Sequence, residues 1–146
     1  VARLIAITTL KTVFSIQEIS ATDFEEYRLV NELILQGQMV QPSILVAQAL
    51  EDKEYDTVVI SKAADAMLAM SGIEASFVVA KNSQGAISIS ARSRSKINVQ
   101  RIMEELGGGG HFNLAAARLT DMSLQEAGDK LKTVIFNETK EKESEE

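Results

Sequence analysis

Two adjacent strand-like segments in the middle of the chain constrain its fold more than any other feature. Residues 73–81 (IEASFVVAK) are mostly apolar and rich in β-branched and aromatic side chains, a pattern typical of a buried strand. Residues 85–93 (GAISISARS) follow after an NSQG turn, and their apolar and polar side chains alternate. The alternation predicts one face with Ile87, Ile89 and Ala91 and another with Ser88, Ser90 and Arg92. A chain with this centre must build its core around a β-sheet.

Helical patterns flank these strands on both sides. Four segments follow residues that commonly cap helices: 24–35 after Thr22 or Asp23, 58–72 after Asp56 or Thr57, 99–106 after Asn98, and 124–136 after Ser123. Residues 112–119 (FNLAAARL) are expected to form a further helix, residues 43–50 another buried strand, and residues 51–56 a surface loop. The sequence therefore predicts an α/β fold, in which a small mixed sheet packs with helices in a single domain.

Composition divides the chain into three parts. Residues 1–40 are predicted to be an N-terminal helical arm or linker from a preceding domain, residues 41–137 the folded domain, and residues 138–146 a disordered acidic tail. The first sixteen residues are apolar, but Arg3 and Lys11 interrupt them, so this segment is too short and too polar to span a bilayer. Because the sequence begins with Val1 rather than methionine, we expect a fragment or a processed form.

The composition excludes several kinds of site. The 146 residues include no cysteine and one histidine, so the chain has no disulfide, no thiolate nucleophile and no metal site built from several histidines. The formal net charge of -6 argues against a general affinity for nucleic acid. A local basic pocket remains compatible with this charge.

A run of four glycines, Gly107–Gly110, stands directly before His111, the single histidine. Alone, such a run is more often a hinge than a ligand site. However, residues 81–101 lead into it with five basic residues and no acidic one: Lys81, Arg92, Arg94, Lys96 and Arg101. Exposed backbone N–H groups, the start of a following helix and an arginine all favour a bound phosphate. We therefore expect a phosphate pocket at the glycines, His111 and Arg92, with Arg94 and Lys96 merely solvated.

The segment SISARSRSKINVQRIMEELGGGGHFNLAAARL resembles the signature of the DHH-associated domain, the substrate-binding domain of a family of manganese-dependent phosphoesterases. The resemblance covers roughly residues 43–136. Three residues separate His111 from Ala115, as in the membrane-anchored cyclic di-AMP phosphodiesterases of Gram-positive bacteria, the GdpP type; oligoribonuclease-type members usually have two. Arg94-Ser95 departs from the Leu-Gly that is frequent in the family, so we expect a stiffer and more basic loop there.

The resemblance implies a division of labour between two domains. A preceding DHH domain would hold two manganese ions for hydrolysis of cyclic di-AMP to pApA. This chain would bind no metal; it would hold cyclic di-AMP, pApA or AMP. The residues carried over by motif are Arg92 and Ser93 for phosphate, Gly108, Gly109 and Gly110 for the nucleotide, and His111 for the phosphate that is not cleaved. The chain alone lacks the Asp-His-His motif and is expected to be inactive.

Three alternatives stay open. The parent is either the cyclic di-AMP phosphodiesterase or a DHH-family enzyme acting on short oligonucleotides or pApA. A stand-alone nucleotide-binding or dimerisation module is a second alternative, and the related domain at the end of alanyl-tRNA synthetases a third. The net charge of -6 disfavours that third alternative and any long nucleic acid partner. We expect a cytoplasmic domain of a membrane-anchored protein, with no transmembrane segment in this chain, whose homodimerisation is left open.

Overall fold

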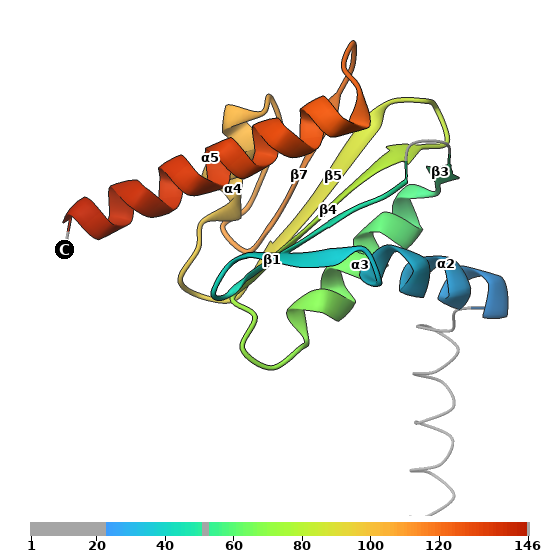
Figure 1. Ribbon diagram of the computed structural model, residues 1–146, viewed down its shortest axis with the longest axis horizontal. Helices are drawn as coiled ribbons and strands as arrows, with labels where there is room; N and C mark the ends of the chain where they lie inside the picture. The colour runs from blue at the N-terminus through green and yellow to red at the C-terminus, as the bar shows by residue number, and fades with distance from the viewer. Residues whose placement is uncertain (1–22, 51–52, 146) are drawn as a thin grey trace, which may run out of the picture.

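The computed structural model describes residues 23–50 and 53–145, which form a sheet between two pairs of helices (Figure 1). The strands are β1 (Gly37–Gln41), β2 (Ile44–Gln48), β3 (Glu54–Tyr55), β4 (Ala75–Asn82), β5 (Ile87–Ser93), β6 (Gly109–Gly110) and β7 (Leu114–Leu119). The helices are α2 (Phe24–Ile34), α3 (Thr57–Leu68), α4 (Val99–Glu105) and α5 (Leu124–Glu145).

The described strands form one seven-stranded mixed sheet in the order β1-β2-β4-β5-β7-β6, with β3 paired to the end of β4. The pairing of β2 with β4 is parallel, because α3 carries the chain back between them. The pairs β1–β2, β4–β5, β5–β7 and β6–β7 are antiparallel. This architecture confirms the predicted α/β fold with a small mixed sheet.

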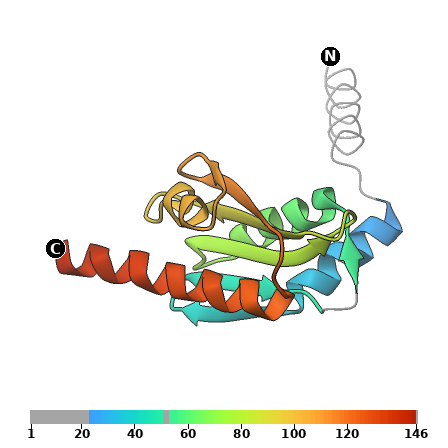
Figure 2. The same cartoon turned by 90° about the horizontal axis from the view of Figure 1, so that it is seen from above.

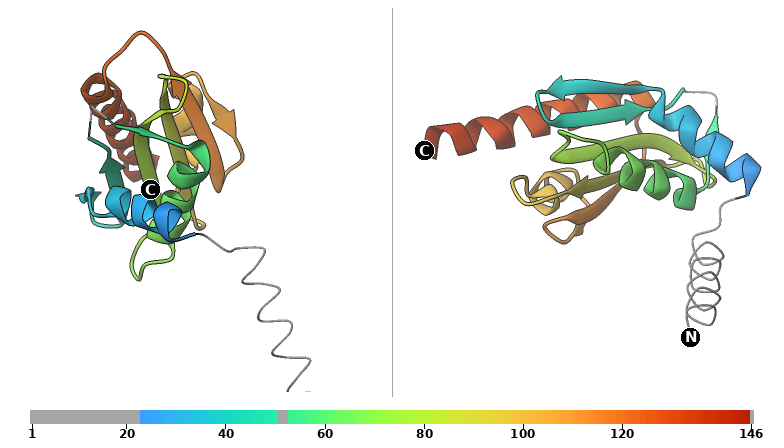
Figure 3. Two further views of the ribbon diagram at one scale, coloured as in Figure 1. Left: turned by 90° about the vertical axis from the view of Figure 1, so that its right-hand side faces the viewer. Right: turned by 90° about the horizontal axis from the view of Figure 1, so that it is seen from below.

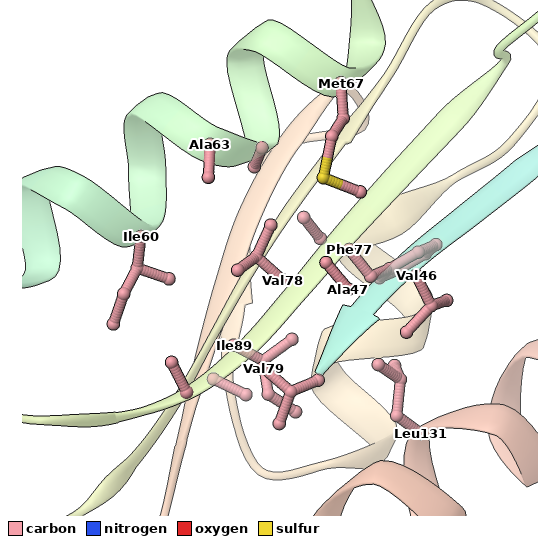
Figure 4. Packing of buried hydrophobic residues seen from close by; sticks show 14 of the residues in the cluster. Val46, Ala47, Ile60, Ala63, Met67, Phe77, Val78, Val79, Ile89 and Leu131 are labelled. Atoms are coloured by element: carbon pink, nitrogen blue, oxygen red, sulfur yellow. The ribbon is translucent and has the colours of Figure 1, made fainter. Parts of the chain in front are cut away.

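The two faces of the sheet carry different helices. α3 covers β4 and β5 on one face and has α2 beside it, while α4 and α5 cover the opposite face (Figures 2 and 3). Figure 4 shows Val78 directed toward α3 and Leu131 of α5 on the other side of the sheet. Residues 75–80 of β4 are all buried, because helices cover this strand on both sides. A strand buried on both faces accounts for the continuous apolar run in the sequence.

The predicted helix starts are confirmed by their capping hydrogen bonds. Four side chains accept a backbone N–H in the first turn: Asp23 from Glu26 (2.8 Å), Asp56 from Val58 (2.9 Å), Asn98 from Arg101 (3.3 Å) and Ser123 from Glu126 (3.1 Å). These bonds satisfy N–H groups that have no partner within the helix.

The helix predicted at residues 112–119 is wrong, because residues 114–119 form strand β7. Their burial alternates strictly between exposed and buried, with Ala115, Ala117 and Leu119 buried and Leu114, Ala116 and Arg118 exposed. Three consecutive alanines favour a helix by local propensity. Pairing with β5 on one side and β6 on the other overrides that weak preference.

Two other expectations are corrected. The described part of the acidic loop contains strand β3, in which Tyr55 is buried rather than at the surface. Residues 138–145 continue α5 instead of forming a disordered tail. There, Gln41 donates to Thr139 at 2.8 Å, and Glu138 lies 3.5 Å from Arg101, so the start of this segment is held by contacts that the sequence does not reveal.

The expected N-terminal arm lies only partly within the described residues. Residues 1–22 are outside them, while the following segment forms α2 and β1. Val30 and Leu33 of α2 are buried in the same core as the sheet. The described end of this segment is therefore packed against the domain. None of the described helices combines the length and the apolar character that crossing a membrane requires.

Glu32 of α2 accepts three hydrogen bonds from two residues of the β3 segment, Lys53 and Tyr55. Lys53 donates to its carboxylate at 2.8 Å and Tyr55 donates at 2.6 Å. The hydrogen bond from Lys53, with that from Tyr55, lowers the pKa of the Glu32 carboxyl. Burial, with the hydrogen bond to Glu32, raises the pKa of the Tyr55 hydroxyl. The native fold therefore favours an ionised Glu32 beside a neutral Tyr55.

Replacing Glu32 with glutamine is expected to reduce the free energy of unfolding at pH 7 by about 1 kcal/mol. A carboxyl whose pKa is lowered by folding stabilises the fold above its unfolded pKa of about 4.3, and this contribution is lost as the pH falls through the folded value. The deficit of the variant should thus be constant from about pH 6 to 8 and shrink below about pH 4. Urea unfolding of both proteins across this range measures it. A deficit that stays unchanged at pH 3 would contradict this account.

Candidate functional site

The glycine run connects α4 to the edge of the sheet. Gly107 has a φ of 82° and follows the last turn of α4, where its N–H donates to Glu104 at 3.0 Å and the N–H of Gly108 donates to Met103 at 2.7 Å. This pair of bonds is the Schellman pattern that ends many helices, and it requires the left-handed conformation that glycine adopts without strain. Gly107 is therefore explained by the helix end.

Gly108 and Gly110 are explained by close packing against β7. A Cβ on Gly108 would lie 2.7 Å from the Cα and Cβ of Ala117, and a Cβ on Gly110 would lie 2.5 Å from the carbonyl oxygen of Leu114. Gly110 also has a φ of 145°. Neither position has room for a side chain, so the fold itself requires glycine at both.

Gly109 differs from its neighbours. A Cβ built on it meets no atom within 4 Å, and its φ is not positive. Gly109 pairs with Ala116, and His111 exchanges two backbone hydrogen bonds with Leu114 at 2.8 and 3.3 Å. Because hydrogen-bonded pairs alternate along an antiparallel ladder, the N–H of Gly110 points away from β7. The glycine strand thus presents an open surface and a backbone donor at the sheet edge.

The turn after the glycines is fixed by hydrogen bonds to β5 and α4. The carbonyl oxygen of Phe112 accepts the Ser93 hydroxyl at 3.1 Å and the Val99 N–H at 3.0 Å. The side chain of Asn113 donates to the carbonyl oxygens of Ser93 at 3.2 Å and of Arg94. Ser93 is itself buried, so in this structure its hydroxyl holds the turn that carries His111.

Arg92 and His111 occupy different environments. His111 is exposed at the start of the turn. Arg92 is 8% exposed; its Nε donates to Asp65 of α3 at 2.7 Å and its Nη1 donates to the carbonyl of Ala91 at 3.0 Å. Asp65 remains largely exposed, with 62% of its side chain accessible. Any anion that reaches Arg92 must therefore share it with the Asp65 carboxylate.

A hollow of about 390 Å³ opens between α3 and the β5–β7 part of the sheet. Its floor includes Ser88 and Ser90 of β5, which lie opposite Arg118 and Ala116 of β7 in the strand register. Ser61 of α3 lines the wall, and its hydroxyl lies 3.4 Å from that of Ser90. Gly107 and Gly108 also line it. The hollow exists because α3 covers β4 and β5 but leaves this face of β7 exposed.

The structure brings together only part of the predicted site. Gly108 borders the hollow, whereas Arg92 lies on β5 two residues beyond Ser90. Ser93 ends β5 and contacts the turn that carries His111. Of the other basic residues, Arg94 donates to the carbonyls of Ile73 and Leu68, and Arg101 lies near two carboxylates of α5. The basic residues that are clustered in the sequence therefore do not form one positive pocket in the structure.

Sequence reasoning missed Ser61 and Arg118. The alternation of small polar residues in β5 was the available signal, since it placed Ser88, Ser90 and Arg92 on one face. Arg118 was hidden because its segment was assigned to a helix. Within residues 23–50 and 53–145, no three histidine or carboxylate side chains gather closely enough to hold a metal ion. The manganese implied by the resemblance therefore has no set of ligands in this part of the chain.

Comparison with known proteins identifies the family. The DHHA1 domain matches residues 41–140. The chain is 42% identical over 106 residues to the cyclic-di-AMP phosphodiesterase GdpP of Geobacillus thermodenitrificans, covering 73% of this chain and 16% of that protein. It is 39% identical over 120 residues to the cyclic-di-AMP phosphodiesterase PdeA of Listeria monocytogenes, covering 82% and 18%. The chain thus spans less than a fifth of the length of these relatives.

A solved structure shares the fold at low sequence identity. An exopolyphosphatase-related protein from Bacteroides fragilis superposes with a TM-score of 0.70 at 16% identity, over 81% of this chain and 36% of that one. At this identity the likeness concerns the fold alone. The family match covers most of the chain and includes the glycine run and both strands that flank the hollow. The resemblance to the DHH-associated domain is confirmed, and the chain belongs to the DHHA1 domain family.

Proposed function

We propose that this chain is the substrate-binding domain of a cyclic di-AMP phosphodiesterase, and that it binds the nucleotide along the groove between α3, β7 and the glycine strand. The observation that carries the proposal is the identity of about 40% to two proteins named cyclic-di-AMP phosphodiesterases, over more than 70% of the chain. The parent would convert cyclic di-AMP to pApA. A membrane anchor for the parent, with this domain in the cytoplasm, belongs to the same proposal.

The geometry suits a nucleotide phosphate at the glycine strand. Gly109 leaves its surface open, the Gly110 N–H points outward, and the exposed His111 follows directly. Backbone N–H groups and an imidazole N–H are ordinary donors to a phosphate oxygen. Ser93 would act on this site by holding the Phe112 carbonyl and thereby the turn. Arg92 would reach a phosphate only by sharing or leaving Asp65.

Hydrolysis would be the task of a preceding DHH domain. Manganese ions there would activate water and stabilise the attack at phosphorus. The role assigned to this chain is to bind and orient the substrate, since its described residues offer no cluster of metal ligands. On this proposal the isolated chain does not hydrolyse cyclic di-AMP, and manganese-dependent hydrolysis by a pure preparation would overturn that part.

Calorimetric titration with cyclic di-AMP, pApA and AMP tests the binding role. Replacing His111 or Arg92 with alanine should each weaken binding by about 1–3 kcal/mol, the range for hydrogen bonds to charged groups. Arg28, which is exposed on α2 and paired with Glu25, provides a matched control through Arg28→Ala. Circular dichroism verifies the folding of each variant.

Three outcomes of this titration are informative. Unchanged affinity in both variants for a ligand that binds the wild type would refute the phosphate pocket. Preference for pApA over cyclic di-AMP would favour the alternative enzyme that acts on short oligonucleotides. Absence of binding by all three nucleotides would refute the proposed function.

A further inference from the structure

Arg118 has a special position in the hollow between α3 and the β5–β7 strands. Among the described residues that line the hollow it is the only charged one, in a protein whose net charge is -6. It lies on the exposed face of β7, directly opposite Ser88 of β5. No carboxylate lines the hollow with it.

The other described arginines are engaged with carboxylates or backbone carbonyls. Arg28 pairs with Glu25, Arg92 with Asp65 and Arg101 with Glu138, while Arg94 donates to two carbonyls. Arg118 donates to the neutral side-chain oxygen of Gln84 at 2.7 Å and takes part in none of the ion pairs of the described residues. Its charge is therefore uncompensated, unlike that of Arg92.

The hydroxyl groups around Arg118 are also suited to an anion. The Oγ of Ser88 accepts a hydrogen bond from Asn82 at 2.9 Å, so its own proton is left to donate elsewhere. Ser61 and Ser90 share one contact at 3.4 Å, in which a single hydroxyl proton is used. Hydroxyl groups that can still donate a hydrogen bond, beside a guanidinium with no carboxylate partner among the described residues, favour binding of a phosphate over binding of an apolar ligand.

We infer that Arg118 anchors one phosphate of the bound nucleotide in this hollow. The inference rests on the proposed function. It implies that the two ends of the groove differ in charge. The Arg118 end offers an anion an uncompensated charge, whereas at the Arg92 end an anion must share the guanidinium with the Asp65 carboxylate. One phosphate of the nucleotide therefore lies at Ser88 and Arg118, and the rest of the nucleotide extends toward the glycine strand, where the proposed function places the other phosphate.

The test uses Arg118→Gln, with Arg28→Gln as a control that makes the same charge change on α2. α2 contacts α3 and β2, away from the hollow. Two probes are titrated and followed by backbone amide NMR: cyclic di-AMP and inorganic pyrophosphate. Arg118→Gln should raise the dissociation constant of both probes roughly tenfold, the effect of losing one charged hydrogen-bonding partner. Arg28→Gln should change either constant by less than about twofold. Shifts of the Ser88, Ser90 and Gly108 amides identify binding in the hollow.

The outcomes separate this inference from the proposed function. If cyclic di-AMP binds wild type and Arg118→Gln equally well, Arg118 is not the anchor and the proposed function stands. If pyrophosphate binds in the hollow through Arg118 but cyclic di-AMP does not bind, the anchor stands and the proposed function fails. If neither probe shifts the amides of the hollow, the inference is overturned. Unchanged melting temperature in Arg118→Gln establishes that weaker binding is not a loss of folding.

Discussion

Replacing Gly108 with alanine is expected to lower the free energy of unfolding by about 3 kcal/mol or more. The added Cβ would lie 2.7 Å from the Cα and Cβ of Ala117 and nearer still to the Ala116 carbonyl. Both contacts involve backbone atoms of a strand held by pairing on two sides, so neither can move without breaking the β6–β7 ladder. Urea unfolding measures the loss.

Gly109→Ala is the matched control for this experiment. Its Cβ meets nothing within 4 Å, and its backbone needs no positive φ, so stability should stay within about 1 kcal/mol of the wild type or rise slightly. On the proposed function the same change covers the open glycine surface and weakens cyclic di-AMP binding. Equal stability losses for Gly108→Ala and Gly109→Ala would refute this division between a structural and an exposed glycine.

Phe77→Ala is expected to destabilise the protein by about 3–5 kcal/mol. Phe77 lies at the centre of β4, is 0% exposed and belongs to the core cluster with Met67 and Ile89 (Figure 4). Its removal leaves a cavity in a strand that helices cover on both faces, where the neighbours have little freedom to collapse.

Phe24→Ala provides the comparison for the change at Phe77. Phe24 is 80% exposed on α2, so the same chemical change should alter stability by less than about 0.5 kcal/mol. Thermal or urea unfolding of the two variants measures the difference. Similar stability losses would mean that Phe77 does not have the central role in the core that its burial indicates.

Much of this fold is predictable from local sequence because local and tertiary preferences agree. The capping residues Asp56 and Asn98 define two helix starts, and the apolar run of residues 75–80 belongs to a strand covered on both sides. β7 is the exception. Its alanines prefer a helix in isolation, but small side chains on one face allow α4 to pack closely and glycines to lie beside it.

The site is less predictable because sequence proximity does not give spatial proximity. The run of basic residues before the glycines indicated one positive pocket, yet Arg92 is bound to Asp65, and Arg94 to a carbonyl at the end of α3 and one in the loop before β4. Arg118 and Ser61 come from segments distant from that run and meet only through the sheet register and the packing of α3. Whether a charged side chain can bind a ligand depends on its partners in the fold. Those partners are set by tertiary structure and cannot be read from the sequence.

The strand order also has a consequence for the sequence of events during folding. β4 and β5 form an antiparallel hairpin joined by a short turn, whereas the β2–β4 and β5–β7 pairs each join strands that are separated by a helix in the chain. Loop closure makes such non-local pairing slow. We therefore expect the β4–β5 hairpin to form before β2 pairs with β4 and before β7 pairs with β5. Pulse-labelling hydrogen exchange should protect the amides of β5 before those of β2.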